Sequence, residues 1–259
     1  MTVQVFYPSP VDALVSALPL KEMDASLLSR AILTEVYRYD LDLDLFESAI
    51  AFASWAHRNQ TRAQRGSMPR VHYIEHPLRV CNRLLRYGVT DQDVLLAAIL
   101  HDTVEDHAMA IAVDVMGGVP RDEQEARLIA MICIRKNYGE GVARIVRGLS
   151  NPISADGLTV EDAHAEYRAH VEHAIRDTQV AIVKFSDFED NAGGLHHNVG
   201  PGTEKMVAKL AKKYWPLVPV FSERISRADF APFVPADGRK QMREHIDGAR
   251  VTLRRLHTI

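Results

Sequence analysis

Six consecutive residues, His101 to Asp106, carry four of the chain's ionisable side chains directly after an apolar run. That run, residues 94–100, is apolar on every face of a predicted helix, which indicates a buried element. Helical spacing would set Asp102 beside Glu105 and Asp106, so like charges would gather where hydration is lost. Burying an unpaired carboxylate costs on the order of several kcal/mol. A divalent metal ion is a compact source of the missing positive charge, so the segment predicts a metal site.

Two distant segments can complete this site. His76 precedes a predicted helix at 77–87, and Asp187 follows an apolar run at 180–185. We therefore expect the metal ligands to be His76, His101, Asp102 and Asp187. Two imidazoles and two carboxylates form a mixed nitrogen and oxygen set, which suits manganese, iron or zinc better than magnesium or calcium.

The chemistry expected of such a site is metal-assisted hydrolysis at a phosphoryl group. A bound divalent ion lowers the pKa of coordinated water and polarises a phosphoryl oxygen. Glu105 and Asp106 lie one turn beyond the ligands, where they could transfer a proton or orient that water.

Simpler interpretations exist for each part of this pattern. A His-Asp pair occurs by chance in many proteins, and residues 101–106 could form an exposed helix end. Seven further histidines are interpreted as surface residues or hydrogen-bonded core residues: His72, His107, His164, His170, His173, His196 and His197. Agreement among three separated segments favours the metal site over these alternatives.

Helices are the elements that must position the site. Alternating patterns of strand length are nearly absent, and Thr90 is a plausible N-cap for the buried helix, with Asp93 as its acidic partner. Residues 61–73 contain Gly66 and Pro69 and are predicted to be a loop. The fold class is all-α, with further helices predicted at 24–37, 45–60, 121–137, 140–149, 160–176, 178–191, 203–214, 217–226 and 238–257.

Composition narrows the functional classes. The net charge of −3 argues against a general nucleic-acid binder, whereas a local group of arginines is enough to bind a small phosphorylated ligand. The two cysteines, Cys81 and Cys133, lack CxxC spacing, so a disulfide framework is not expected. No apolar stretch approaches the length of a membrane span, and the N-terminus lacks signal-peptide order, so we expect a cytoplasmic protein without a membrane partner.

Five motifs in order resemble the hydrolase domain of RelA/SpoT-type alarmone enzymes and its stand-alone version, the small alarmone hydrolases. The likeness spans roughly residues 45–225, and its most diagnostic string is AAILHDTVED. The motifs are AHRNQTR (56–62), YIEHPLRV (73–80), AAILHDTVED (97–106), VAIVKFSDFEDN (180–191) and EKMVAKLAKKYWPLV (204–218).

The resemblance implies an HD-type helical bundle and a nucleotide substrate. The implied reaction removes the 3′-diphosphate from ppGpp or a related alarmone, usually with manganese, and releases pyrophosphate and a nucleoside 5′-di- or triphosphate. By position, Glu105 and Asp106 become the catalytic acids, and Arg62, Asn191 and Lys205 become nucleotide or phosphate contacts. Weaker candidates for such contacts are Arg58 and Lys184. From the residues alone, Arg62 and Lys205 could equally be solvated charges, Asn191 a helix cap, and Lys184 a side chain that extends from a buried helix.

The sequence departs from the family pattern near the substrate. Ala63 and Phe188 stand where basic residues are common, and Gly193 and Gly194 remove side chains from the region expected to face the nucleotide. An adenosine alarmone, or another nucleotide hydrolysed by an HD enzyme, therefore stays an alternative substrate. A third hypothesis is a nucleotide sensor without turnover, which would be expected to lack Glu105, Asp106 or one of the metal ligands. The expected division is an N-terminal helical extension (1–44), the hydrolase domain (45–226) and a C-terminal helix packed on it (227–259). The sequence does not indicate an oligomeric state.

Overall fold

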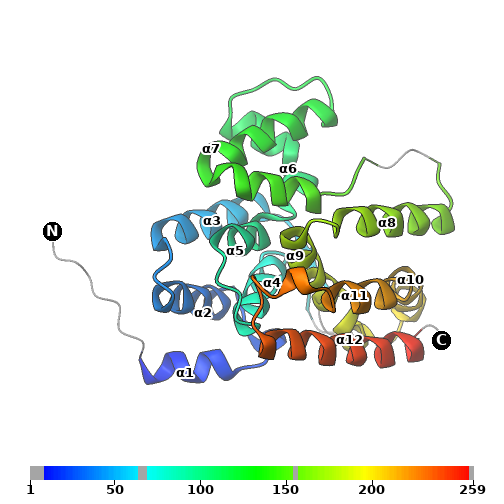
Figure 1. The fold of residues 1–259 in the computed structure, drawn as a ribbon. Coiled ribbons are helices and arrows are strands. Elements are labelled where there is room, and N and C mark those ends of the chain that lie inside the picture. The colour runs from blue at the N-terminus through cyan, green and yellow to red at the C-terminus, as the bar shows by residue number, and fades with distance from the viewer. Residues whose placement is uncertain (1–8, 64–68, 154–156, 257–259) are drawn as a thin grey trace.

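The computed structural model describes residues 9–63, 69–153 and 157–256, and within these ranges the fold is built almost entirely from helices (Figure 1). The predicted all-α class is confirmed. The α-helices are α1 (Pro10–Ala17), α2 (Ala25–Arg38), α3 (Leu43–Ala56), α4 (Glu75–Arg86), α5 (Gln92–Leu100), α6 (Thr103–Ala110), α7 (Glu123–Leu149), α8 (Val160–Ala174), α9 (Thr178–Phe188), α10 (Glu204–Tyr214), α11 (Leu217–Ile225) and α12 (Ala236–Leu256). Short helical turns are η1 (Leu20–Glu22), η2 (Ile111–Val115), η3 (Glu189–Gly193), η4 (Leu195–Asn198) and η5 (Ala228–Phe230).

The core forms around α4, α5 and α9, which lie in the middle of the molecule (Figure 1). Every residue of α5 from Val94 to Leu100 is buried, as the apolar run predicts. α5 packs against α4, α7 and α9, while α2 packs on the other side of α4. The buried helices are therefore the same helices that end or begin at the predicted metal ligands.

Two details of the helix boundaries differ from the sequence prediction or refine it. Asp91, not Thr90, caps α5, because its carboxylate accepts a hydrogen bond from the Val94 amide. The single helix α7 covers both predicted helices at 121–137 and 140–149, and it is interrupted at Gly139, whose φ of 93° lies in the left-handed region.

The predicted loop at 61–73 contains a small antiparallel ladder, which the sequence analysis did not predict. β1 (Thr61–Arg62) pairs with β2 (Val71–His72) in the register Thr61↔His72. The ladder is too short to show a periodic pattern in sequence, and residues 64–68 lie outside the described residues. It brings Arg62 and Tyr73 to the side of the molecule where the site forms.

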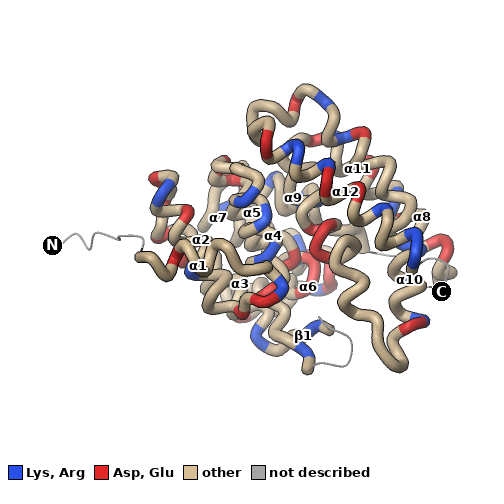
Figure 2. The backbone as a smooth tube through the Cα atoms, turned by 90° about the horizontal axis from the view of Figure 1, so that it is seen from below, with Lys and Arg blue, Asp and Glu red and all other residues tan. Residues whose placement is uncertain are grey.

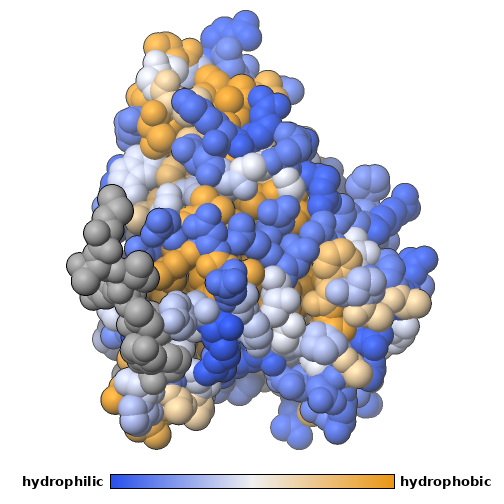
Figure 3. All heavy atoms as spheres, turned by 60° about the vertical axis from the view of Figure 1, so that its left-hand side comes forward, coloured by the Kyte–Doolittle hydropathy of each residue, from blue (hydrophilic) through white to orange (hydrophobic). Residues whose placement is uncertain are grey.

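The C-terminal helix α12 packs on α10, α11 and η3, and Gly238 lets it approach the carbonyl of Tyr87 closely. The last residue of the predicted helix at 238–257 lies outside the described range. Acidic and basic positions are interspersed along the chain in Figure 2. On the face shown in Figure 3, apolar patches are separated by hydrophilic side chains. Among the described residues, no helix is both long and apolar enough to cross a membrane.

Candidate metal centre and substrate cleft

A break between α5 and α6 places the His-Asp pair. α5 ends at Leu100 and α6 begins at Thr103, with His101 and Asp102 in the turn between them. Successive side chains of a continuous helix diverge by roughly 100°. Here, by contrast, His101 and Asp102 face a common point, with His101 Nε2 3.1 Å from Asp102 Oδ2. The Thr103 hydroxyl donates to the Leu100 carbonyl at 2.7 Å, which satisfies one backbone acceptor at the break.

The four predicted metal ligands converge in the structure, and we call them the central cluster: His76, His101, Asp102 and Asp187. His76 Nε2 lies 3.2 Å from Asp187 Oδ1 and 3.6 Å from Asp102 Oδ2. His101 Nε2 lies 3.9 Å from Asp187 Oδ1. The ligand atoms of His76, His101 and Asp102 all lie within 4.8 Å of one another. Three separate segments thus bring two imidazoles and two carboxylates to one point.

Hydrogen bonds on the far side of each imidazole fix the tautomer that carries its proton on Nδ1, which leaves the Nε2 atom facing the centre unprotonated. His101 Nδ1 donates to the Ala98 carbonyl at 2.9 Å, and His76 Nδ1 donates to Asp190 Oδ2 at 2.8 Å. Both rings are therefore free to present an Nε2 lone pair inward. His101 Nε2 is buried and has no hydrogen-bond partner among the described residues. A buried lone pair of this kind is what a metal ion would use.

Asp190, which the sequence analysis did not single out, supports the cluster from behind. Its carboxylate is fully buried and accepts hydrogen bonds from Arg79 Nε at 2.9 Å and Arg83 Nη2 at 3.0 Å, in addition to the bond from His76. Burial alone would raise the pKa of Asp190, but Arg79 and Lys21 lower it well below its usual range. A carboxylate behind a ligating histidine is a common support in metal sites, because it holds the ring and increases its basicity.

The charge balance of the central cluster calls for a cation. Burial lowers the pKa of His101, but the Asp102 and Asp187 carboxylates outweigh burial and raise this pKa to about 9. Burial would also raise the pKa of Asp102, yet His101 and His76 hold it well below its usual range. The two carboxylates thus require positive charge beside them. A divalent ion can supply it, and the donor set fits a transition metal.

Tyr73 and two predicted substrate contacts, Arg62 and Asn191, are joined to the cluster by hydrogen bonds. Tyr73 donates its hydroxyl to Asp102 Oδ2 at 2.7 Å. Asn191 donates from Nδ2 to Asp187 Oδ1 at 2.6 Å, and its own amide oxygen accepts from Arg62 Nη2 at 2.8 Å. Arg62 and Asn191 therefore form a chain of hydrogen bonds that ends on a predicted ligand, and Asn191 is not a simple helix cap.

Lys184 and Glu105 flank the cluster. The buried Lys184 Nζ lies 3.4 Å from Asp187 Oδ2, and although burial lowers its pKa, Asp187 and Glu105 together raise it. Lys184 is therefore a buried charge that pairs with the site. Glu105 accepts from the backbone amide of Asn151 at 2.8 Å and from its side chain at 2.9 Å, which turns the carboxylate toward the neighbouring cleft.

The remaining predicted site residues lie further from the cluster. Arg58 stacks on Trp55, 4.7 Å from the ring centre, and lies 3.9 Å from Asp114. Lys205 is exposed on α10 and is not among the residues that line the cleft. Asp106 accepts from Gln60 Nε2 at 2.9 Å, and burial together with Asp102 raises its pKa. No described hydrogen bond or ion pair connects Arg58 or Lys205 with the four predicted ligands.

A cleft of about 710 Å³ opens beside Glu105, between the Asn151 region, α8 and α10. Its polar lining includes the cationic residues Arg127, Lys209 and Lys213, which the sequence analysis did not select. Lys213 Nζ lies 3.8 Å from the centre of the Tyr167 ring, and burial and Lys184 lower its pKa. The regular four-residue spacing of lysines 205, 209 and 213 along one helix face was the available signal.

The glycines after Asn191 accommodate the protein's own side chains. A Cβ at Gly193 would overlap the Glu189 carboxylate, and a Cβ at Gly194 would come too close to the Lys21 side chain. Lys21 Nζ also donates to the Asp190 carbonyl at 3.1 Å. The side chains of Glu189 and Lys21 therefore extend into the space beside these glycines, and the expectation that this region faces the nucleotide stays a prediction.

Sequence comparisons agree with the resemblance drawn from the motifs. The guanosine-3′,5′-bis(diphosphate) 3′-pyrophosphohydrolase MESH1 of Danio rerio is 32% identical over 139 residues, 53% of this chain and 62% of that protein. The guanosine-3′,5′-bis(diphosphate) 3′-pyrophosphohydrolase of Aquifex aeolicus is 27% identical over 180 residues, 69% of this chain and 22% of that protein. The bifunctional (p)ppGpp synthase/hydrolase SpoT of Escherichia coli is 26% identical over 178 residues, 68% of this chain and 22% of that protein.

These alignments confirm that the chain resembles RelA/SpoT-type alarmone hydrolases. The aligned segment spans about three fifths of the Danio rerio protein and about a fifth of the two bacterial proteins. No model of a known protein family matches the chain.

Proposed function

We propose that this protein is a manganese-dependent hydrolase that removes the 3′-diphosphate from (p)ppGpp-like alarmones. The products are pyrophosphate and a nucleoside 5′-di- or triphosphate. One observation carries the proposal: His76, His101, Asp102 and Asp187 converge around a buried His101 Nε2 that has no hydrogen-bond partner among the described residues. The names of the relatives supply the substrate class.

In this proposal the four residues of the central cluster hold one divalent ion. The ion would lower the pKa of bound water and polarise a phosphoryl oxygen. Asp190 keeps the His76 ring in the tautomer that ligation needs, and Tyr73 holds Asp102 by its hydroxyl.

The protein's own acids would manage the proton of the attacking water. Glu105 faces the cleft and is held by Asn151. Asp106 has a raised pKa, so it is a better proton acceptor than an ordinary surface aspartate. We assign to these two carboxylates the roles of orienting the water and accepting its proton.

The cationic lining of the cleft would bind the nucleotide. Arg127, Lys209 and Lys213 can pair with phosphate oxygens, and Tyr167 offers an aromatic face nearby. The Arg62–Asn191 pair would reach the phosphate nearest the metal by exchanging an internal hydrogen bond for a contact with substrate. Arg58, Lys184 and Lys205 stay predictions as substrate contacts.

A substrate panel tests the reaction. The panel contains ppGpp, pppGpp, their adenosine analogues and common nucleotides, and the products are separated by chromatography. We expect pyrophosphate release only from the 3′-substituted compounds. Release of phosphate from ordinary nucleotides, with the alarmones untouched, would instead assign the chain to HD phosphohydrolases of other nucleotides. Turnover of the adenosine compounds alone would indicate that the substrate is an adenosine alarmone.

Metal removal and return tests the cofactor. We expect chelator-treated protein to lose hydrolysis and to regain it best with Mn²⁺, because the mixed imidazole and carboxylate set suits that ion. Turnover would be measured at matched concentrations of Mn²⁺, Zn²⁺, Mg²⁺ and Ca²⁺. A preparation whose activity is indifferent to chelation would contradict the proposed centre.

A further inference from the structure

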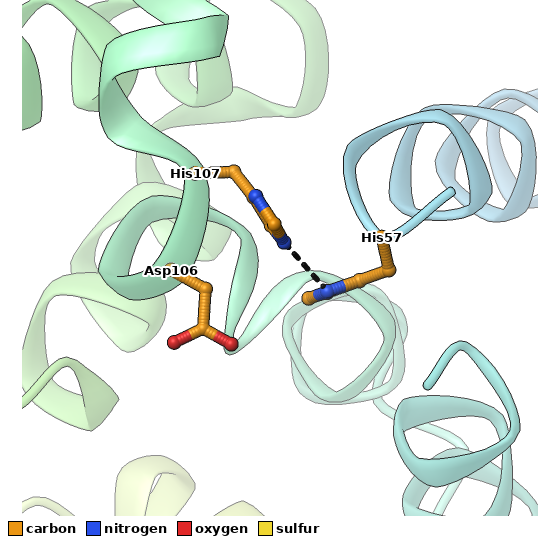
Figure 4. Close-up of side chains that lie close together, drawn as sticks. All are labelled: His57, Asp106 and His107. Atoms are coloured by element: carbon orange, nitrogen blue, oxygen red, sulfur yellow. Dashed lines mark hydrogen bonds between the residues drawn. The ribbon is translucent and has the colours of Figure 1, made fainter. Parts of the chain in front are cut away.

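A second group of polar side chains lies beside the central cluster, where the end of α3 meets α6. We call it the outer cluster: His57, Gln60, Asp106 and His107. His57 is the residue after α3 and is only 1% exposed, whereas Asp106 and His107 lie on α6. Figure 4 shows His57, Asp106 and His107 pointing toward one another. The ligand atoms of these three residues lie within 4.8 Å of one another.

Three polar atoms in the outer cluster are in mutual contact. His57 Nδ1 lies 2.7 Å from Gln60 Oε1, and His107 Nε2 lies 3.0 Å from His57 Nδ1 and 3.1 Å from Gln60 Oε1. The other end of the Gln60 amide donates from Nε2 to Asp106 Oδ2 at 2.9 Å. This last bond fixes the amide so that its oxygen faces both imidazoles.

Hydrogen bonds alone cannot satisfy all three contacts. The amide oxygen only accepts, and each ring nitrogen carries at most one proton. If both imidazoles donate to Gln60, their two N–H groups face each other. If one imidazole instead accepts from the other, its lone pair faces the amide oxygen. Reversing the amide would set its oxygen against the Asp106 carboxylate.

A bound cation would satisfy all three atoms together. With metal–ligand distances of about 2.1 Å, neighbouring ligands of an octahedral ion lie roughly 3.0 Å apart. The measured separations of 2.7, 3.0 and 3.1 Å match one triangular face of such an octahedron. The backbone also departs from helical geometry at His107, where φ is −133°.

We propose that the outer cluster binds a second divalent transition-metal ion through His57 Nδ1, His107 Nε2 and Gln60 Oε1, with the Asp106 carboxylate beside it and bonded to the Gln60 amide. Imidazole and oxygen ligands suit manganese, cobalt or zinc.

The two clusters adjoin through Tyr73. The Tyr73 ring lies 4.8 Å from that of His57, centre to centre, while its hydroxyl donates to Asp102. The second ion would fix Gln60, whose amide donates to Asp106, and would so hold this carboxylate in place beside the central cluster. Its binding does not depend on the substrate proposed above.

Counting bound ions tests the proposal directly. Full-length protein stripped with a chelator is dialysed against Mn²⁺ alone, or Co²⁺ alone, and the ions per chain are measured by elemental analysis. We expect two ions in the wild-type protein and one in His107→Ala. The double variant His76→Ala/Asp187→Asn should keep one ion, held by the outer cluster. The matched control is His173→Ala, an exposed histidine of α8, which should keep two.

A milder variant controls for the case in which His107→Ala loses its ion because the protein misfolds. Gln60→Ala should weaken the affinity for one of the two ions by at least about tenfold and leave the other unchanged. One ion in the wild-type protein, retained by His107→Ala, would overturn the proposal. A second ion that persists in both His107→Ala and Gln60→Ala is a surface ion and would overturn it as well. Ion counting is independent of turnover, so a failure of the proposed hydrolysis would leave these results unaffected.

Discussion

The central and outer clusters both bring histidines together with carboxylates, but they are supported in different ways. Each imidazole of the central cluster has a hydrogen bond behind it, and Asp190 in turn is held by two buried arginines. In the outer cluster His57 Nε2 is buried with no hydrogen-bond partner among the described residues. The central cluster is therefore held in place by hydrogen bonds behind its imidazoles, whereas the proposed outer site has no such support at His57 Nε2.

The largest expected effect comes from replacing a predicted metal ligand of the central cluster. We expect Asp102→Asn to lower hydrolysis by more than about a thousandfold, because it removes one of two charges that hold the ion. His101→Ala should have a similar effect. Turnover of the alarmone would be measured beside the far-ultraviolet circular dichroism, which should stay that of a helical protein. Full activity in either variant would contradict the site.

The next largest effect should come from replacing Asp190, which is not a predicted ligand but supports His76 from behind. Asp190→Asn leaves Arg79 and Arg83 as buried cations without their carboxylate, which should destabilise the fold by about 3–5 kcal/mol. It should also weaken Mn²⁺ binding by about 10- to 100-fold, because His76 loses its partner. Denaturant unfolding and metal titration would measure the two effects separately.

A matched substitution controls for the loss of an aspartate charge. Asp114 is about half exposed and lies 3.9 Å from Arg58, so Asp114→Asn should change stability by less than about 0.5 kcal/mol. If Asp190→Asn behaved in the same way, the claim that the central cluster is supported from behind would be wrong.

The smallest expected effect lies outside both clusters, at the buried Arg224. Asp229 accepts from this guanidinium at 2.8 Å, but its own side chain is 49% exposed. Hydrogen bonds from Arg224 and Thr178 lower the pKa of Asp229 to about 2. Because solvent screens the pair, and Arg224 also donates to the Ile175 carbonyl, Asp229→Asn should cost less than about 1 kcal/mol at neutral pH.

The contribution of Asp229 to stability should depend on pH, and its lowered pKa gives the direction of that dependence. A lowered aspartate pKa stabilises the folded state fully above the unfolded value of about 4, and this contribution is lost as the pH falls through about 2. The stability difference between wild type and Asp229→Asn should therefore shrink as the pH falls from 5 to about 3. Denaturant midpoints across this range would measure it, and a widening difference would exclude the assignment.

The sequence predicted the parts of the site that lie in continuous motifs. The run at 94–100 identified the buried helix, and the motifs around it selected the four residues of the central cluster. Asp190 was missed although a signal existed: His76, Arg79 and Arg83 share one face of α4, and Asp190 lies three residues after Asp187, near the end of α9. Only packing between α4 and α9 joins these faces.

The outer cluster could not be predicted in the same way. His57 and His107 are separated by 50 residues, and their contact depends on a local departure from helical geometry at His107. The sequence alone indicates a surface or hydrogen-bonded core residue at His107, and this side chain does lie within hydrogen-bond distance of His57 and Gln60. The division into an extension, a domain and a C-terminal helix stays a prediction.

The interruption between α5 and α6 also constrains how this chain can be redesigned. Neighbouring side chains of a regular helix diverge by roughly 100°, and the pair His101–Asp102 lies in the turn between the end of α5 and the start of α6. Re-engineering the junction into a seamless, more stable helix would turn one of the two side chains away. A continuous helix at this point should therefore weaken the metal binding proposed for the central cluster.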